Sequence, residues 1–183
     1  MKKALLTAAI ALALAYGGTS IAANNPMVGG APMFDSKNIV ENAMNSKDHT
    51  TLVAAVKAAG LVETLQGAGP FTVFAPTNEA FAALPAGTVD TLLKPENKGT
   101  LTKVLTYHVV PGRIDTAWLD KEIKANGGKA MLKTVEGETL WVSGTGHSLT
   151  LTDGKGGSAK ITIADVYQKN GVIQVIDKVL HPK

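Results

Sequence analysis

The stretch FTVFAPTNEAF, residues 71–81, passes from a strand pattern to a helix pattern with no loop between them. Its first five residues alternate as the residues of a half-buried strand do, and Pro76 ends the alternation. Thr77 is a favourable N-cap residue, and Glu79 follows in the first turn, where a negative charge meets the positive end of the helix dipole. The stretch therefore predicts a strand that turns directly into a helix.

Proteins often place nucleophiles or phosphate-binding loops at junctions of this kind. This junction has no glycine that would let a substrate approach the backbone. The Thr77 hydroxyl is best used in capping the helix, and the Asn78 amide is suited to hydrogen bonds with neighbouring main chain. We therefore interpret residues 71–81 as a corner of the fold and not as a reactive site.

The first 23 residues have the layout of a secretory signal peptide. Lys2 and Lys3 precede an apolar run from Ala4 to Ala15, and small residues follow as far as Ala23. The run is shorter than the ~20 residues that a membrane-spanning helix needs, so we expect no membrane span in the mature form. The prediction is a protein that is secreted or periplasmic after cleavage behind Ala23; an uncleaved signal anchor is the alternative.

Charge and cysteine content exclude several classes of protein. Without residues 1–23 the chain has 16 basic and 15 acidic residues, and Arg113 is the single arginine. No basic stretch offers a footprint for DNA or RNA, so we expect no nucleic-acid partner. The absence of cysteine excludes a disulfide framework, a thiolate nucleophile and a cysteine-bound metal.

The pattern of the chain changes once. Residues 24–35 are rich in Gly, Pro and Asn and suggest an extended leader. Helical periodicity follows, with Ser36 as the expected cap of the first helix and Gly60 as the end of the second. From Lys129 onward the period is two, with glycine-containing turns between short strands. Helices followed by an antiparallel half indicate an α+β fold, and we assign residues 36–183 to a single domain.

No catalytic or metal-binding pattern is legible. The four histidines have no partner at a spacing of three or four residues, which a helical metal pair requires; they are His49, His108, His147 and His181. The glycine-rich stretch at 153–158 lacks the spacing of a phosphate-binding loop and lies between two alternating patterns, where a hairpin turn is the ordinary interpretation. We therefore expect a protein that is not an enzyme and has no metal or cofactor.

Three segments together resemble the sequence landmarks of the fasciclin domain family. They are FTVFAPTNEAF at 71–81, TYHVVPG at 106–112 and NGVIQVIDKVLHP at 170–182, and the similarity runs from about Asn38 to Pro182. The chain is most similar to small, single-domain, secreted bacterial members. The resemblance implies a twisted β-sandwich or wedge with several helices packed against it, in which the first and last segments are neighbouring strands. It also implies a structural role in the core for Phe71, Phe74, Pro76, Thr77, Asn78, Phe81, Gly171, Val175, Ile176 and Asp177.

The resemblance also implies a function and candidate site residues. Animal members of the family mediate cell adhesion through extracellular partners, including integrins. Two stretches are credited with this: a Tyr-His motif, matched here by Tyr107 and His108, and an Asp-Ile pair, matched by Asp165 and Val166 with valine in place of isoleucine. We nevertheless expect Tyr107 to be mostly buried, His108 to be hydrogen-bonded within the domain, and Asp165 to be the most accessible of the four.

Two functions fit these observations. The first is a non-catalytic extracytoplasmic adhesion or interaction module that binds a protein, matrix or cell-surface partner. The alternative is a carrier of an apolar small molecule such as a carotenoid, with Trp118, Trp141 and Met131 lining a groove. The same three side chains would serve a core equally well.

The signal-peptide interpretation gives a direct prediction. Cleavage behind Ala23 leaves Asn24 as the mature N-terminus, because the basic start, the short apolar run and the small residues before the cut have the required order. Intact-mass analysis of protein from the extracytoplasmic fraction measures this. A cytosolic chain that begins at Met1 would contradict it.

Overall fold

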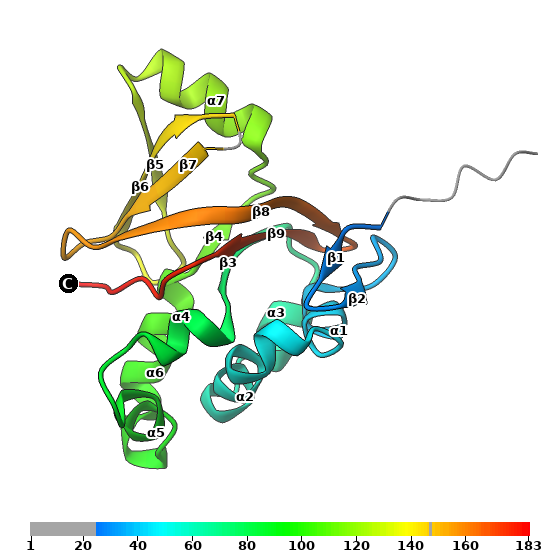
Figure 1. Ribbon diagram of the computed structural model, residues 1–183, viewed down its shortest axis with the longest axis vertical. Coiled ribbons are helices and arrows are strands. Elements are labelled where there is room, and N and C mark those ends of the chain that lie inside the picture. The colour runs from blue at the N-terminus through cyan, green and yellow to red at the C-terminus, as the bar shows by residue number, and fades with distance from the viewer. Residues whose placement is uncertain (1–24, 147) are drawn as a thin grey trace, which may run out of the picture.

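The computed structural model describes residues 25–146 and 148–183. The predicted signal peptide, residues 1–23, and His147 lie outside the described residues. The chain forms one seven-stranded sheet with helices packed against it (Figure 1), which is the α+β fold expected from the sequence.

The sheet has the strand order β4-β3-β9-β8-β7-β6-β5. The bounds are β3 (Phe71–Pro76), β4 (Val109–Pro111), β5 (Lys129–Lys133), β6 (Thr139–Thr145), β7 (Ser148–Thr152), β8 (Ser158–Gln168) and β9 (Gly171–Ile176). All neighbours pair antiparallel except β3 and β9, which run parallel. The sheet curls until the end of β5 approaches β4, where the Val135 N–H donates to the Val109 carbonyl at 2.8 Å. The result is the wedge that the family resemblance implied.

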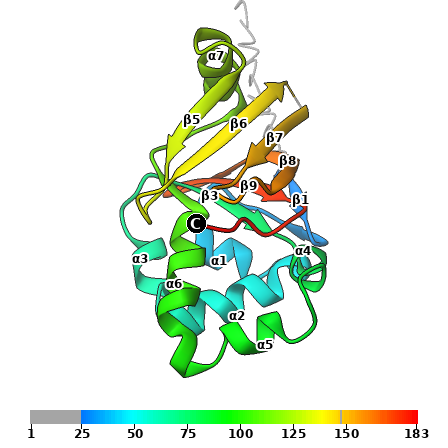
Figure 2. The same cartoon turned by 90° about the vertical axis from the view of Figure 1, so that its left-hand side faces the viewer.

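Helices cover the two ends of this sheet differently. They are α1 (Ile39–Ala43), α2 (Thr50–Ala59), α3 (Val62–Gln66), α4 (Asn78–Ala82), α5 (Thr88–Leu92), α6 (Lys98–Tyr107) and α7 (Thr116–Ala125), with 3₁₀ turns η1 (Lys47–His49) and η2 (Pro95–Asn97). Figure 2 shows α1–α6 gathered below β3 and β9, whereas α7 lies at the opposite end beside β5 and β6.

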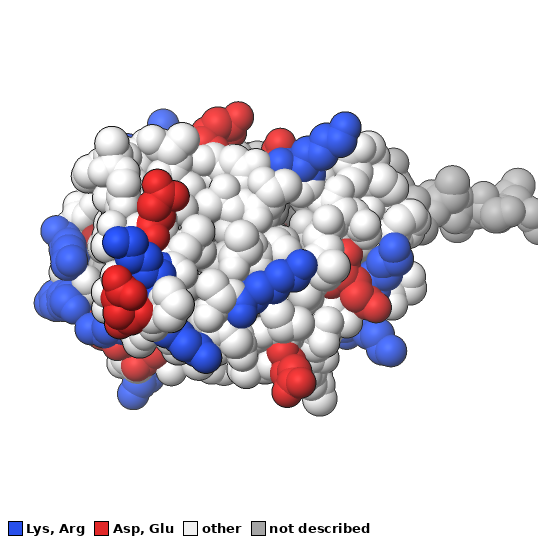
Figure 3. All heavy atoms as spheres, turned by 90° about the horizontal axis from the view of Figure 1, so that it is seen from below, with Lys and Arg blue, Asp and Glu red and all other residues white. Residues whose placement is uncertain are grey.

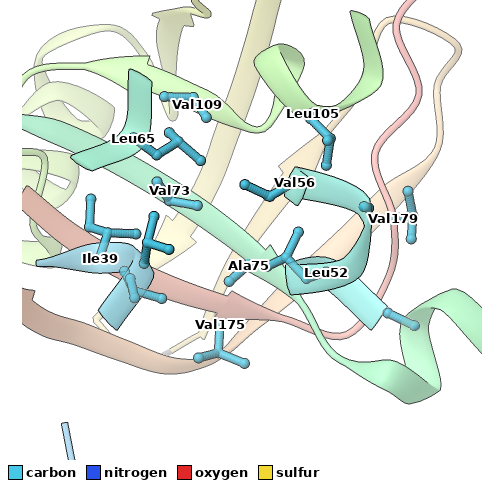
Figure 4. Packing of buried hydrophobic residues seen from close by; sticks show 14 of the residues in the cluster. Ile39, Leu52, Val56, Leu65, Val73, Ala75, Leu105, Val109, Val175 and Val179 are labelled. Carbon is cyan, nitrogen blue, oxygen red and sulfur yellow. The ribbon is translucent and has the colours of Figure 1, made fainter. Parts of the chain in front are cut away.

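Strand β3 separates two hydrophobic cores. Val73 and Ala75 face the first core, which α1, α2 and α6 close from the other side (Figure 4), while Phe74 faces the second core beneath α7. The sequence alternation predicted a strand with one buried face. The structure buries both faces of β3, because Thr72 and Phe74 on the second face are also covered. Thr72 is accommodated there because its hydroxyl donates to the Gly112 carbonyl and accepts from the Ile114 N–H.

The corner at 76–78 connects the sheet to two helices. Thr77 is the N-cap of α4, with its hydroxyl oxygen accepting from the Ala80 N–H at 3.3 Å. Asn78 reaches the start of α2 instead: its Oδ1 accepts from the Thr51 N–H at 3.0 Å, and its Nδ2 donates to the Lys47 carbonyl at 2.7 Å. Both polar side chains of the corner are thus used in satisfying helix ends.

The N-terminal part of the domain differs from the sequence expectation in two ways. The first helix is capped by Asn38, not Ser36, because Glu41 stands three residues after Asn38 and completes a reciprocal capping box. The described part of the expected leader, residues 25–35, also contains a small hairpin, β1 (Met27–Val28) with β2 (Ala31–Pro32). Val28 and Met33 are buried in the first core, so this segment packs on the domain.

The capping geometry predicts the effect of Thr77→Ala. Loss of the N-cap oxygen leaves one N–H of α4 without its partner, and we expect the free energy of unfolding to fall by ~0.5–2 kcal/mol. Denaturant melts measure this. Thr100→Ala is the matched control, because Thr100 is exposed on α6. Equal midpoints for Thr77→Ala and the wild type would contradict the assignment.

Candidate partner-binding site

Tyr107 ends α6 and is completely buried, with 0% of its surface exposed. Its hydroxyl donates to the Thr139 carbonyl at 3.1 Å and accepts from the Gly154 N–H at 2.9 Å. Burial raises the pKa of this phenol to about 12, so it stays neutral and able to donate. The side chain joins α6 to β6 and to the turn between β7 and β8, as the packing interpretation of this residue expects.

His108 follows directly and is 2% exposed. Its Nδ1 lies 2.8 Å from the Val104 carbonyl, which only accepts, so Nδ1 carries the proton. Its Nε2 then accepts from the Leu180 N–H at 3.0 Å and holds the C-terminal segment against the domain. Burial lowers the pKa of the imidazole to about 4. Both nitrogens are satisfied internally, and neither is available to a partner.

Asp165 and Val166 lie in β8, where the pairing with β9 is irregular. Asp165 has a φ of 57°, the left-handed region that Asp tolerates better than most residues. Its carboxylate accepts from the N–H and hydroxyl of Thr116 and from the amide of Gln174, so the start of α7 is tied to the bulge. Val166 is fully buried in the first core. Asp165 is partly exposed and is the most accessible of the four motif residues.

The structure does not bring the two motifs together. Tyr107 packs in the second core and Val166 in the first. The side-chain hydrogen bonds of Tyr107 and His108 go to β6, the 153–157 turn, α6 and the C-terminal segment, whereas those of Asp165 go to α7 and β9. Three of the four side chains have almost no surface that a partner could touch.

The residues beside Asp165 are exposed where Asp165 itself is engaged. Tyr167 is 40% exposed, and its hydroxyl donates to the Asp115 carboxylate at 3.3 Å. The Arg113 guanidinium lies 5.8 Å from the centre of the Tyr167 ring and donates to the Gln168 carbonyl at 3.3 Å. We call these three side chains, Arg113, Asp115 and Tyr167, the Arg113–Tyr167 surface. The sequence did not predict this surface, because the alternation of Ile161 and Ile163 would place residue 167 on the buried face. The bulge between Ile163 and Val166 shifts the phase, so that Val166 is buried and Tyr167 faces outward.

Three further features were sought in the described residues: a metal site, a membrane-spanning helix and a basic strip. Among the described residues there is no group of three or more His, Asp or Glu side chains placed to hold a metal ion. None of the helices in this part of the chain has the length and apolarity to cross a bilayer. The face shown in Figure 3 carries basic and acidic side chains interspersed, without a continuous basic strip among the described residues drawn there.

Of the three expected groove residues, Met131 and Trp141 border one surface hollow, and Trp118 does not line it. Trp118, Trp141 and Met131 are all exposed on the surface. Two small apolar cavities, of about 30 and 20 Å³, lie instead in the first core between the helices and β3. They share the side chains of Ile39, Ala43, Leu52 and Val73.

Comparisons with known proteins agree with this geometry. The family model described as Fasciclin domain matches residues 47–182. Protein sll1483 of a Synechocystis strain is 51% identical over 79% of this chain and 73% of its own length. Immunogenic protein MPB70 of Mycobacterium bovis is 38% identical over 76% of this chain and 66% of its own. Transforming growth factor-beta-induced protein ig-h3 of Sus scrofa is 40% identical over 72% of this chain but only 17% of its own.

The structure is also similar to a solved one. It superimposes with a TM-score of 0.70 on a FAS1 domain pair from the insect cell adhesion molecule Fasciclin I, over 79% of this chain and 51% of that one. The sequence identity is 16%, so this likeness concerns the fold.

The buried imidazole predicts a pH dependence of stability. The folded pKa of His108, about 4, lies below the ordinary value of 6.5, so the unfolded chain binds a proton that the folded chain does not. The contribution of the neutral His108 ring to the free energy of unfolding is complete above pH 6.5 and is lost as the pH falls towards 4. We expect the free energy of unfolding to be ~2 kcal/mol lower at pH 5 than at pH 7. The pKa of His49 is lowered in the same direction by burial.

Urea unfolding of the wild type and of His108→Gln at both pH values measures this difference. The variant should show a smaller fall, because it lacks the titrating ring. Thr100→Ala, at an exposed site without a group that titrates in this range, is the control and should keep the wild-type dependence. An equal fall in His108→Gln and wild type would show that His108 is not the responsible group.

Proposed function

This chain belongs to the fasciclin domain family, and we propose that it is a non-catalytic extracytoplasmic interaction module that binds a protein partner through the Arg113–Tyr167 surface. The observation that carries the proposal is the exposure of a tyrosine and an arginine side by side at the position of the family's Asp-Ile motif. Tyrosine and arginine are enriched among the residues that supply most of the binding energy at protein interfaces.

The surface is held in place before any partner arrives. Tyr167 is bonded to Asp115, and Arg113 is bonded to the Gln168 carbonyl, so each side chain loses less freedom on binding than a free one would. Beneath them, Asp165 fixes the first residue of α7 to the bulge in β8. A pre-ordered tyrosine on β8 and an arginine in the connection between β4 and α7 are well suited to a docking contact.

The four motif residues have a positioning role in this proposal. Tyr107 and His108 secure α6 and the C-terminal segment, and Val166 anchors β8 in the core. Asp165 is the one member with exposed surface, and its carboxylate is already engaged in three internal hydrogen bonds. Substitution of Asp165 is therefore expected to disturb the surface through the backbone as well as through any lost contact.

The relatives support the class of function. A domain pair of the same fold comes from an insect cell adhesion molecule. The match to ig-h3 covers a small part of that protein, so only a single-domain binding role is proposed for this chain. We place the module outside the cytoplasm, secreted or periplasmic, because of the signal-peptide pattern in residues 1–23.

A carrier of an apolar small molecule such as a carotenoid is the second candidate. It is favoured by the two apolar cavities in the first core. At about 30 and 20 Å³ they are far below the ~300–1,000 Å³ of a typical ligand pocket, so α1 and α2 would have to move away from β3 to admit one. An absorption spectrum of the protein purified from its native host decides between the two: a bound chromophore supports the carrier.

The proposal predicts that surface variants lose binding without losing stability. The measurement is the attachment of cells of the producing organism to surfaces coated with the exported protein. Tyr167→Ala combined with Arg113→Ala should reduce attachment at least ~10-fold, because truncation of such residues commonly costs more than 1 kcal/mol of binding energy each. The melting temperature should change little.

Tyr107→Phe is the matched control for this experiment. It removes the buried hydroxyl, so it should lower stability by ~1–3 kcal/mol, yet attachment below its melting temperature should equal that of the wild type. Attachment that persists in the double surface variant, or is lost in folded Tyr107→Phe, would contradict the proposed surface.

A further inference from the structure

β5 is an edge strand whose outer side is unpaired. It pairs with β6 alone, and the register joins Met131 to Trp141. The Thr134 N–H donates to the Glu138 carbonyl at the turn, so even-numbered residues of β5 direct their backbone groups to β6. Odd-numbered residues face the other way, as the bond from the Val135 N–H to β4 shows.

β4 lies beside β5, but no hydrogen bond joins β4 to residues 129–133 in the described part of the chain. Within residues 25–146 and 148–183, no hydrogen bond satisfies the outward backbone groups of Lys129, Met131 and Lys133. Figure 2 shows β5 as the outermost strand of its half of the sheet. Three successive donor–acceptor pairs at one edge are a template for another strand.

The side chains of the same residues are also exposed. Met131 is 63% exposed and lies beside Trp141, which is 41% exposed. These two side chains border a surface hollow of about 420 Å³ that runs to the end of α7, where Glu122 and Asn126 line it. The edge therefore has a place for one apolar side chain next to its unpaired backbone.

The charges along the edge select the partner. Lys129 and Lys133 flank Met131 on the same face, and neither forms a salt bridge within the described part of the chain. In an antiparallel pair of two β5 strands centred on Met131, Lys129 would face Lys133 of the other copy, and like charges directly opposite each other are destabilising. Acidic residues at the same positions would be attracted.

We propose that the outer edge of β5 binds an extended acidic segment of another protein, which adds a strand to the sheet. The segment places two carboxylates opposite Lys129 and Lys133 and an apolar side chain between them, against Met131 and Trp141. Two strands, β6 and β7, lie between β5 and β8, which carries Tyr167, so the interaction is separate from the Arg113–Tyr167 surface.

A synthetic peptide tests the proposal with the exported protein. The probe is acetyl-Thr-Glu-Thr-Val-Thr-Glu-Thr-amide, and the comparison peptide has lysine in place of both glutamates. NMR titration should show shifts concentrated in β5 for the acidic peptide and at least tenfold weaker binding for the basic one. Lys129→Glu combined with Lys133→Glu should reverse this preference. Lys94→Glu combined with Lys155→Glu is the control, because it changes the net charge equally at exposed sites elsewhere.

Backbone pairing is tested on the peptide, so that it does not depend on a protein variant that folds. N-methylation of alternate residues removes the amides on one edge of the peptide at a time. One of the two methylated forms should fail to bind. The proposal is overturned if both methylated forms bind like the parent peptide, or if the control lysine variant weakens binding as much as the β5 variant. It is also overturned if sedimentation shows that the protein self-associates and the β5 lysine variant changes that self-association.

Discussion

β3 and β9 lie side by side in the parallel sense over six residue pairs, although paired residues differ by 100 in number. The pairing requires the two backbones to approach closely at Phe71 and Gly171, where a Cβ on Gly171 would collide with the Phe71 carbonyl oxygen. Only glycine leaves that space free. β3 lies between the two hydrophobic cores. The close contact of β3 with β9 therefore positions α1, α2 and α6, which pack on one core, relative to α7, which packs on the other.

Asn170 extends the same constraint to the helices. Its backbone carbonyl accepts from the Phe71 N–H at 3.0 Å, its Oδ1 accepts from the Ile39 N–H, and its Nδ2 donates to the carbonyls of Leu65 and Gly67. The side-chain amide thus ties α1 and α3 to the turn before β9, while the backbone carbonyl of the same residue bonds β3. Removal of the amide would leave the backbone groups of Ile39, Leu65 and Gly67 without these bonds, which makes Asn170 costly to replace. Asn170 and Gly171 therefore act together: the Asn170 amide bonds α1 and α3, and the absence of a Cβ on Gly171 allows β9 to approach β3.

Local features of the fold were predictable from the sequence because they depend on neighbouring residues. The alternation from Lys129 onward gave the hairpins, and Thr77 and Gly60 gave helix boundaries that the structure shows. The parallel order of β3 and β9 was not readable from patterns, since it depends on contacts between distant segments; the resemblance only implied that they are neighbours. The exposure of the motif residues agrees with the sequence expectation that Tyr107 is buried, His108 is hydrogen-bonded within the domain and Asp165 is the most accessible. The partners of these side chains are distant in the sequence and were not predictable.

Burial of the motif residues also has a consequence for how the domain interacts. A side chain that closes the core cannot serve as a contact, so the surfaces proposed here lie elsewhere, on Tyr167 in β8 and on the lysine-flanked edge of β5. Both belong to one continuous sheet. Relative motion between them is restricted by the ladders of β6 and β7, whose buried residues pack under α7. If the two proposed surfaces, an Arg–Tyr pair and a basic strand edge, each bind a partner, the sheet would hold the two partners at a fixed spacing, which is the physical requirement for linking one component to another.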